Sequence, residues 1–313
     1  MEAFNAVTNG HHYESRIRTL SLRNNRLASL DLEPFPQLQN LHIDGNAVAS
    51  ITGLDGLPRI ESVSWREQRT TDAPDARVML RGCDDLSSLC LSRNRFHHVP
   101  IPTVFANLRH LELASAGLEA LDADFGQNLP NLRSLNLNFN AIRDLSPLLG
   151  IGKLHKLWLA GNRVSRLRRT ALVLKDVGPE LAELDLRNNI LTVGFYTPSE
   201  GIGHHEMGLV RPSTSGSHPE HRWEDSREEH PDEGLRRQSL LAAVPGDTDR
   251  DARERLDADT ALRRRVYEMM VRHSCPRMRS LDGLEVGRHD MAAPDRIRDR
   301  LVELGIFPGH QSD

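Results

Sequence analysis

The chain of 313 residues is poor in aromatic residues and cysteine and has no long apolar run. Aromatic residues make up only 4% of the chain, which disfavours an aromatic-rich β-sandwich or barrel and predicts an aliphatic core. The three cysteines (Cys83, Cys90 and Cys275) are too few and too scattered for a disulfide framework or a zinc site. We therefore expect an intracellular protein whose thiols stay reduced.

Further absences exclude whole classes of function. No segment approaches the roughly 20 apolar residues of a membrane span, and the N-terminus lacks the pattern of a secretory signal. The net charge of −4 gives no reason to expect nucleic-acid binding through phosphate neutralisation. The sequence has no glycine-rich phosphate loop and no H-E-x-x-H, C-x-x-C or G-x-S-x-G motif. We expect no enzyme, cofactor, metal, membrane contact or small-molecule substrate.

Leucine, in contrast, recurs in the frame L-x-x-L-x-L-x-x-N-x-L. Steps of 21 to 27 residues separate successive copies, which lies within the window of roughly 20–29 residues that is typical of leucine-rich repeats. The frame predicts an α/β leucine-rich-repeat solenoid of about eight repeats, with a parallel concave sheet and a convex side of 3-10 turns, loops or short helices. The eight positions of the asparagine type are Asn25, Asn46, Gln68, Asn94, Ala116, Asn140, Asn162 and Asn189.

The frame has a physical basis. Leucines two residues apart lie on one side of a short strand, and stacked repeats together supply a core that one repeat cannot form. The asparagine side chain bonds backbone groups in the turn after the strand. We therefore expect looser turns at Gln68 and Ala116. Trp65 occupies a leucine position and is expected in the core.

Composition divides the chain into five parts. The segment rich in Gly, Pro, Ser, His and charge that follows the repeats is predicted to be disordered. Nothing before the first repeat looks like a cap, so we expect the chain to belong to something longer or a partner to cover that end. The predicted parts are a flexible N-terminus (1–14), the solenoid (15–198), a disordered insert (199–258), a C-terminal cap (259–290), and a terminal helix with a tail (291–313).

Two helices are predicted around the last repeat. One begins near Leu167 on the convex side and ends near Gly178. The other begins near Asp259 and shields the last repeat, as terminal repeats require. The apolar face of this second helix is expected to consist of Leu262, Val266, Met269 and Met270.

The binding surface is expected on the concave face, because the x positions of each strand point out of it. Trp158 lies between two inward leucines and should face solvent, where tryptophan is a favoured binding hot spot; the alternative is that it packs along its column and binds nothing. Ala114 and Ala160 beside it should leave a shallow pocket. The predicted contact residues are His110, Glu112, Asn136, Asn138, Lys156, Trp158, Asp185 and Arg187.

Two weaker predictions lie outside that face. Arg66 and Glu67 form a second candidate contact in a loop. Within the insert, Arg236-Arg237-Gln238-Ser239 fits a basophilic phosphorylation site at Ser239.

Four features carry a resemblance to a known family: ESVSWREQ at 61–68, ELDLRNNILTVGFY at 183–196, RRRVYEMMVRHSCPRMRSLDGLEV at 263–286, and the large insert between the last two. The chain resembles the leucine-rich-repeat region of the fungal spindle-pole-body scaffold of the septation initiation (mitotic exit) network, which is related to the animal protein centriolin. The resemblance implies a non-catalytic scaffold in the cytoplasm, on the cytoskeleton. It implies docking, at the spindle pole body, of a small GTPase, its GTPase-activating complex and kinases.

Two other readings stay open at this point. The short repeats are also similar to those of leucine-rich-repeat regulatory subunits of protein phosphatases. A tubulin-folding or cytoskeletal leucine-rich-repeat protein is the third reading, although neither a glycine-rich cytoskeleton-binding domain nor a ubiquitin-like domain is visible in the sequence.

Overall fold

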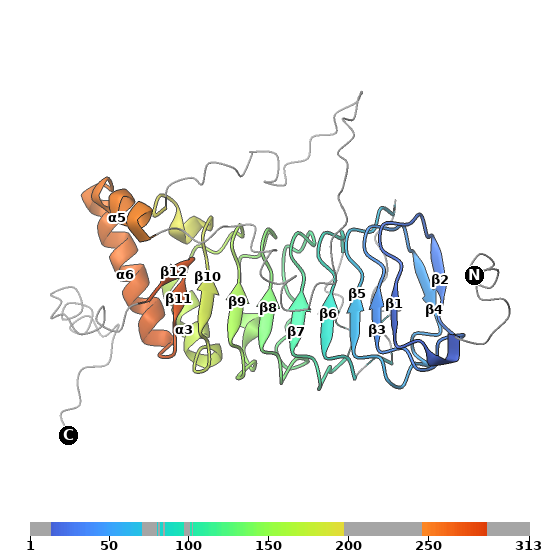
Figure 1. Ribbon diagram of the computed structural model, residues 1–313. Coiled ribbons are helices and arrows are strands. Elements are labelled where there is room, and N and C mark those ends of the chain that lie inside the picture. The colour runs from blue at the N-terminus through green and yellow to red at the C-terminus, as the bar shows by residue number, and fades with distance from the viewer. Residues whose placement is uncertain are drawn as a thin grey trace, which may run out of the picture.

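The computed structural model describes residues 14–70, 80, 82–83, 85–96, 101, 103–196 and 246–286. Its main feature is a row of eight short parallel strands that stand side by side along a solenoid (Figure 1). One strand comes from each copy of the leucine frame, so the prediction of about eight repeats is confirmed. The strands are β1 (Thr19–Ser21), β3 (Asn40–His42), β5 (Ser62–Ser64), β6 (Ser88–Cys90), β7 (His110–Glu112), β8 (Ser134–Asn136), β9 (Lys156–Trp158) and β10 (Glu183–Asp185).

The strands pair in the order of the sequence, and the sheet continues into two strands of the cap. β11 (Ser280–Leu281) pairs in parallel with β10, and β12 (Leu284–Glu285) pairs antiparallel with β11. Near the first repeats, β2 (Ser29–Asp31) and β4 (Ser50–Thr52) form a separate two-stranded parallel sheet. The repeats therefore stack in register from β1 to the cap, which is how they share one core.

The leucines of the frame build that core. The central residue of each strand, a leucine in all but β5, faces inward, with Leu41, Leu89 and Leu135 completely buried. The flanking strand positions point to the opposite face, as the two-residue period of a strand requires. Trp65 is 1% exposed, which confirms its predicted place in the core.

The asparagines tie each repeat to the one before it. The Asn162 amide donates to the carbonyl oxygens of Leu137 in the preceding repeat and Leu159 in its own repeat, both at 2.9 Å. Its Oδ1 accepts the Ile142 N–H at 3.1 Å. In the turn after each strand, backbone N–H and C=O groups have no partner in the β-sheet. The asparagine side chain supplies the hydrogen bonds that these groups need.

The expectation of a looser turn at Gln68 is wrong. Gln68 Nε2 donates to the Ile43 carbonyl at 2.9 Å, and its Oε1 accepts the Val48 N–H at 3.0 Å. The extra methylene of glutamine allows the amide to reach the same kind of backbone partners. Ala116 has no side chain for this role, and its N–H instead donates to Asn140 Oδ1 at 3.0 Å.

Asn162→Ala is expected to lower the free energy of unfolding by about 2 kcal/mol, because it leaves buried backbone groups without partners. Urea denaturation measures the loss. Asn25→Ala is the matched control: Asn25 is exposed and donates only within its own repeat, to Leu22 and Arg23. The control should cost less than about 1 kcal/mol, and equal losses in the two variants would contradict this role of the asparagine ladder.

The convex helix predicted near Leu167 is confirmed as α3 (Leu167–Val177), with its C-cap at Gly178. Elsewhere the described convex side and turns contain the 3-10 helices η1 (Glu14–Arg16), η2 (Ser146–Leu148) and η3 (Ile190–Thr192). This agrees with short repeats that leave no room for a longer helix.

Two helices close the C-terminal end of the solenoid (Figure 1). α5 (Gly246–Glu254) precedes α6 (Ala258–Ser274), which packs against α3. α5 lies inside the predicted disordered insert of 199–258, so that prediction is wrong for residues 246–258. The side chain of Asp257 caps α6 by accepting the N–H groups of Asp259 and Thr260, and such a cap favours helix initiation.

The predicted apolar face of this helix is also wrong in part. Leu262 is 48% exposed, and Val266 and Met269 are only partly buried, whereas Met270 is buried. The helix instead turns Arg264, Tyr267, Glu268, Val271 and Ser274 inward. Charged and polar side chains become buried here because they meet partners from α3, from α5, from the segment at Phe195 and from Asp282 in the cap, described below.

Several predictions lie outside the described residues: the flexible segment before residue 14, the insert from 199 to 245 with Ser239, and the terminal helix and tail of 291–313. In the described part of the chain, no helix is long and apolar enough to cross a membrane. The same part holds no group of three or more His, Cys, Asp or Glu side chains placed to bind a metal ion.

Candidate functional site

The outer face of the parallel sheet, here called the sheet face, brings the predicted contact residues together. His110 lies beside Ser134 in neighbouring strands, and Trp158 lies beside Asn136 and Asp185. The placement predicted from the frame is therefore correct, while binding by these residues stays a prediction. All eight lie on the strands or just after them: His110, Glu112, Asn136, Asn138, Lys156, Trp158, Asp185 and Arg187.

Burial separates these eight residues into two groups. The sequence placed all of them facing solvent, and this is wrong for five, which are 6% exposed or less: Glu112, Asn136, Asn138, Asp185 and Arg187.

Adjacent strands lie about 4.8 Å apart, so long polar side chains on this face contact one another and the next backbone. Asn138 Oδ1 accepts the Ala160 N–H at 2.8 Å, and Arg187 donates to the Asp185 carboxylate at 2.6 Å. The partly exposed residues of the eight are His110, Lys156 and Trp158.

Trp158 is the largest partly exposed side chain among these three. Its neighbour Lys156 places its ammonium nitrogen 5.8 Å from the centre of the indole ring and 3.3 Å from the Glu183 carboxylate. A cation over an aromatic face is attracted by the electrons of the ring. The predicted pocket beside Trp158 is not formed as expected, because Ala160 is completely buried.

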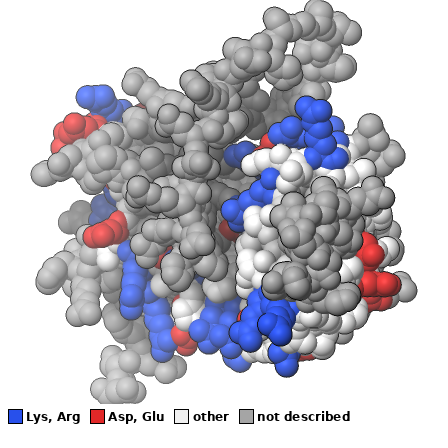
Figure 2. Space-filling view, turned by 45° about the vertical axis from the view of Figure 1, so that its right-hand side comes forward, with Lys and Arg blue, Asp and Glu red and all other residues white. Residues whose placement is uncertain are grey.

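A network of charged side chains crosses the sheet face in the first repeats. Arg23 pairs with Asp44 at 3.1 Å, and Asp44 Oδ1 also accepts from Ser64 Oγ at 2.7 Å. Arg66 lies 3.3 Å from the buried carboxylate of Glu112. Burial raises the pKa of Glu112, while the positive charge of Arg66 opposes that rise. Figure 2 brings this end of the molecule forward and shows more blue than red on the described surface.

The two loop candidates therefore have different positions. Arg66 belongs to the sheet face through its pair with Glu112. Glu67 is exposed in the turn with φ 51°, and it pairs at 3.8 Å with Arg93. Binding by either residue stays a prediction.

A buried carboxylate, missed from the sequence, joins the last repeat to the cap. Asp282 is 0% exposed. One of its oxygens accepts the Leu186 N–H at 2.6 Å, and the other accepts the hydroxyls of Tyr196 at 2.5 Å and Tyr267 at 2.7 Å. Three segments far apart in the chain meet at this side chain, so it locks the cap onto β10.

A cluster of ion pairs around one buried arginine lies next to the Asp282 site. Arg264 of α6 is 1% exposed. It donates to the Phe195 carbonyl at 2.7 Å, to Asp249 Oδ1 at 2.6 Å and to Glu268 Oε1 at 3.0 Å. Its guanidinium also lies 4.5 Å from the centre of the Tyr196 ring. The buried charge is thus matched by two carboxylates, which a buried arginine requires.

Asp282 gives the cap a pH dependence. Burial, with the charge of Asp185 as the second cause, raises the pKa of Asp282 to about 7, against about 3.9 in an unfolded chain. The folded state holds this proton more tightly, so the contribution of Asp282 to stability is present below about pH 4 and is lost as pH rises through about 7.

Asp282→Asn is expected to remove this part of the pH dependence. Asparagine cannot ionise, keeps the acceptor for Leu186 and tolerates the positive φ of 55° at this position. Urea unfolding of the wild type should show the contribution of Asp282 to stability falling from about pH 4 to about pH 7, and the variant should show a flatter profile over that range. Parallel profiles for the two proteins would contradict the assignment.

The fold and the comparisons define the class of protein. The sequence pattern of the family described as leucine rich repeat matches residues 106–164. Together with the eight stacked parallel strands, this match shows that the fold is a leucine-rich-repeat solenoid. Among solved structures, an internalin of Listeria monocytogenes matches 60% of this chain and 68% of its own, at 20% identity and a TM-score of 0.43.

Among curated proteins, the chain is similar to the septation initiation network scaffold protein cdc11 of Schizosaccharomyces pombe, with 27% identity over 265 residues. The match covers 84% of this chain and 24% of cdc11. The chain is also 30% identical over 198 residues to Tsukushi of Gallus gallus, covering 61% of this chain and 46% of Tsukushi. The chain thus spans less than half the length of either relative.

The resemblance to the septation network scaffold is therefore confirmed. A repeat solenoid similar to a protein named as a scaffold points to a protein-interaction domain rather than an enzyme. Two of the distinctive stretches meet in the cap. Tyr196 ends the stretch at 183–196, while Arg264, Tyr267 and Asp282 belong to the stretch at 263–286.

Proposed function

We propose that this chain is a non-catalytic scaffold that holds protein components of a septation initiation (mitotic exit) network at the spindle pole body. The observation that carries the proposal is the similarity to the scaffold protein cdc11 over 84% of this chain. The proposed location is the cytoplasmic cytoskeleton. The proposed partners are spindle-pole-body components, a small GTPase with its GTPase-activating complex, and kinases.

The part of the sheet face around β9 is the proposed contact. Tryptophan buries a large apolar area at little cost in side-chain entropy, and an arginine- or tryptophan-centred patch commonly dominates an interface. Trp158 is partly exposed and is flanked by Lys156, which can pair with an acidic group of a partner. His110, two strands away, extends the same surface.

Trp158→Ala is expected to weaken partner binding by about 2–4 kcal/mol, if Trp158 is the centre of the interface. The measurement is affinity capture from mitotic fission-yeast extract, with quantitative mass spectrometry of the bound proteins, followed by a binding titration with the partner recovered. Leu172→Ala is the matched control, because Leu172 is 64% exposed on α3, away from the sheet face. Melting curves verify that both variants are folded.

The outcomes separate the competing functions. Recovery of septation-network proteins by the wild type and the control, and their loss from Trp158→Ala, supports the scaffold and its site. Recovery with all three proteins moves the site away from Trp158. Recovery of a stoichiometric phosphatase catalytic subunit would instead favour the phosphatase regulatory subunit suggested by the short repeats.

A further inference from the structure

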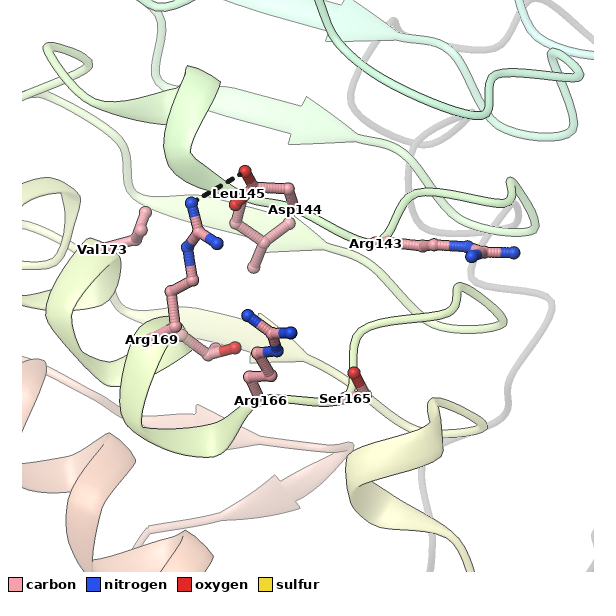
Figure 3. Close-up of a pocket in the computed structure, with 8 residues that line it drawn as sticks. Arg143, Asp144, Leu145, Ser165, Arg166, Arg169 and Val173 are labelled. Carbon is pink, nitrogen blue, oxygen red and sulfur yellow. Dashed lines mark ion pairs between the residues drawn. The ribbon is translucent and has the colours of Figure 1, made fainter.

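An arginine-lined pocket lies on the convex side, where the turn after β8 meets the start of α3 (Figure 3). Its volume is about 330 Å³. It belongs to a part of the solenoid remote from the sheet face, because α3 covers the core from the opposite side. The lining residues are Arg143, Asp144, Leu145, Ser165, Arg166, Arg169, Thr170 and Val173.

The charges around the pocket do not balance. Three arginines line it, and Asp144 is its single acidic residue. Arg169 pairs with Asp144 Oδ2 at 3.2 Å, while Asp144 Oδ1 accepts the N–H of Ser146 at 3.1 Å and its hydroxyl at 2.8 Å. Arg143 and Arg166 are exposed, and among the described residues neither guanidinium lies within ion-pair or hydrogen-bond distance of an acceptor. The charge of Arg166 still acts on Asp144: against the opposing effect of burial, hydrogen bonds from Ser146 and the charges of Arg169 and Arg166 lower the pKa of this carboxyl.

The geometry points to an anionic group bound between two arginines. Figure 3 shows the guanidinium groups of Arg166 and Arg169 on the same side of the pocket, with Asp144 next to Arg169, whereas the side chain of Arg143 points away from them. Three arginines and one aspartate leave a net charge of +2. A phosphoserine or phosphothreonine carries about −1.5 to −2 at neutral pH, and arginine forks bind its oxygens in pairs. A carboxylate side chain would neutralise only half of that charge.

The pocket also has room and lining for a peptide around the phosphate. Leu145 and Val173 give it an apolar wall, and the hydroxyls of Ser165 and Thr170 supply neutral donors. A nucleic acid would need a row of basic contacts along its backbone, whereas this chain carries a net charge of −4 and the arginines gather at one pocket.

We propose that this pocket binds a phosphoserine- or phosphothreonine-containing peptide segment of a partner protein. The phosphate oxygens accept from Arg166, and from Arg143 after its side chain turns inward from the outward position that it has in Figure 3. Arg169 stays paired with Asp144 and adds its positive charge. The interaction is independent of the sheet face, so it would add a phosphorylation-dependent contact to a scaffold whatever the sheet face binds.

The test uses arrays of degenerate peptides centred on phosphoserine or phosphothreonine, beside matched arrays with unphosphorylated or glutamate centres. The double variant Arg143→Gln/Arg166→Gln removes both unpaired charges. Arg168→Gln is the control, because Arg168 is exposed on the same turn of α3 but does not line the pocket. A fluorescent phosphopeptide selected from the array then gives dissociation constants, with inorganic phosphate as a competitor.

We expect the wild type and Arg168→Gln to bind phosphopeptides alike. The double variant should bind about tenfold or more weakly, because it loses charge-assisted hydrogen bonds. Inorganic phosphate should compete only weakly, because it lacks the peptide contacts. Equal binding of unphosphorylated arrays would overturn the proposal, as would full competition by inorganic phosphate or an equal loss in Arg168→Gln, which would indicate nonspecific attraction. Binding by no array would overturn it as well.

Discussion

Arg264→Ala is expected to lower the free energy of unfolding by about 3–5 kcal/mol, the usual cost of removing one member of a buried ion-pair cluster. Arg264 is 1% exposed, and it bridges α5, α6 and the end of the last repeat through Asp249, Glu268 and the Phe195 carbonyl. Its loss leaves two carboxylates in a largely buried site. Arg253 contacts both and can compensate only in part.

Urea denaturation with tryptophan fluorescence measures the loss. Leu262→Ala on the same helix is the control, because Leu262 is 48% exposed and its truncation removes little buried area. Hydrogen exchange should show that protection in Arg264→Ala is lost first in α6 and β10. A loss of less than about 1 kcal/mol would mean that the ion-pair cluster does not hold the cap.

Trp65→Ala is the second large effect, at about 3–5 kcal/mol, because it opens a cavity in a tightly packed core. Trp65 is 1% exposed, and its backbone is held on both sides: its N–H donates to the Cys90 carbonyl at 2.8 Å, and its carbonyl accepts from Asn94 at 2.6 Å. These bonds keep the backbone from moving inward after the indole is removed, so the vacated volume stays largely open.

Thermal and urea unfolding measure the effect of Trp65→Ala. Trp65→Leu restores the residue type of the frame and should recover part of the loss, because leucine refills some of the cavity. Leu172→Ala, at a position that is 64% exposed, is the surface control. A loss in Trp65→Ala no larger than in this control would contradict the assignment of Trp65 to the core.

The repeat fold was predictable because its signal is local. Leucines two and three residues apart determine which side of each strand faces the core. Each repeat then packs against the next one in the same way, so no contact between distant parts of the sequence has to be predicted. Trp65 could be placed by the same frame. The convex helix α3 was predictable as well, since its apolar residues follow a helical period within one segment.

The burial of the sheet face and the cap cluster were not predictable in this way. Strand alternation says that Glu112 and Asp185 point outward, but their burial depends on which side chains lie on neighbouring strands. Asp282 meets Tyr196 across 86 residues of sequence, and Arg264 meets the Phe195 carbonyl across 69. From the sequence alone, a charged residue on a helix is expected to face solvent. Its burial can be recognised only when the distant partner that it contacts in the fold is known.

We propose that this chain performs the task of the matching repeats of a septation scaffold. The most direct test is a chimera in fission yeast, in which this chain replaces the part of cdc11 that it matches. We expect that the chimera supports septation, that its Leu172→Ala form does so equally, and that its Trp158→Ala form fails although the protein is present at normal levels. A stable chimera that cannot support septation, or one that is indifferent to Trp158→Ala, would contradict this proposal.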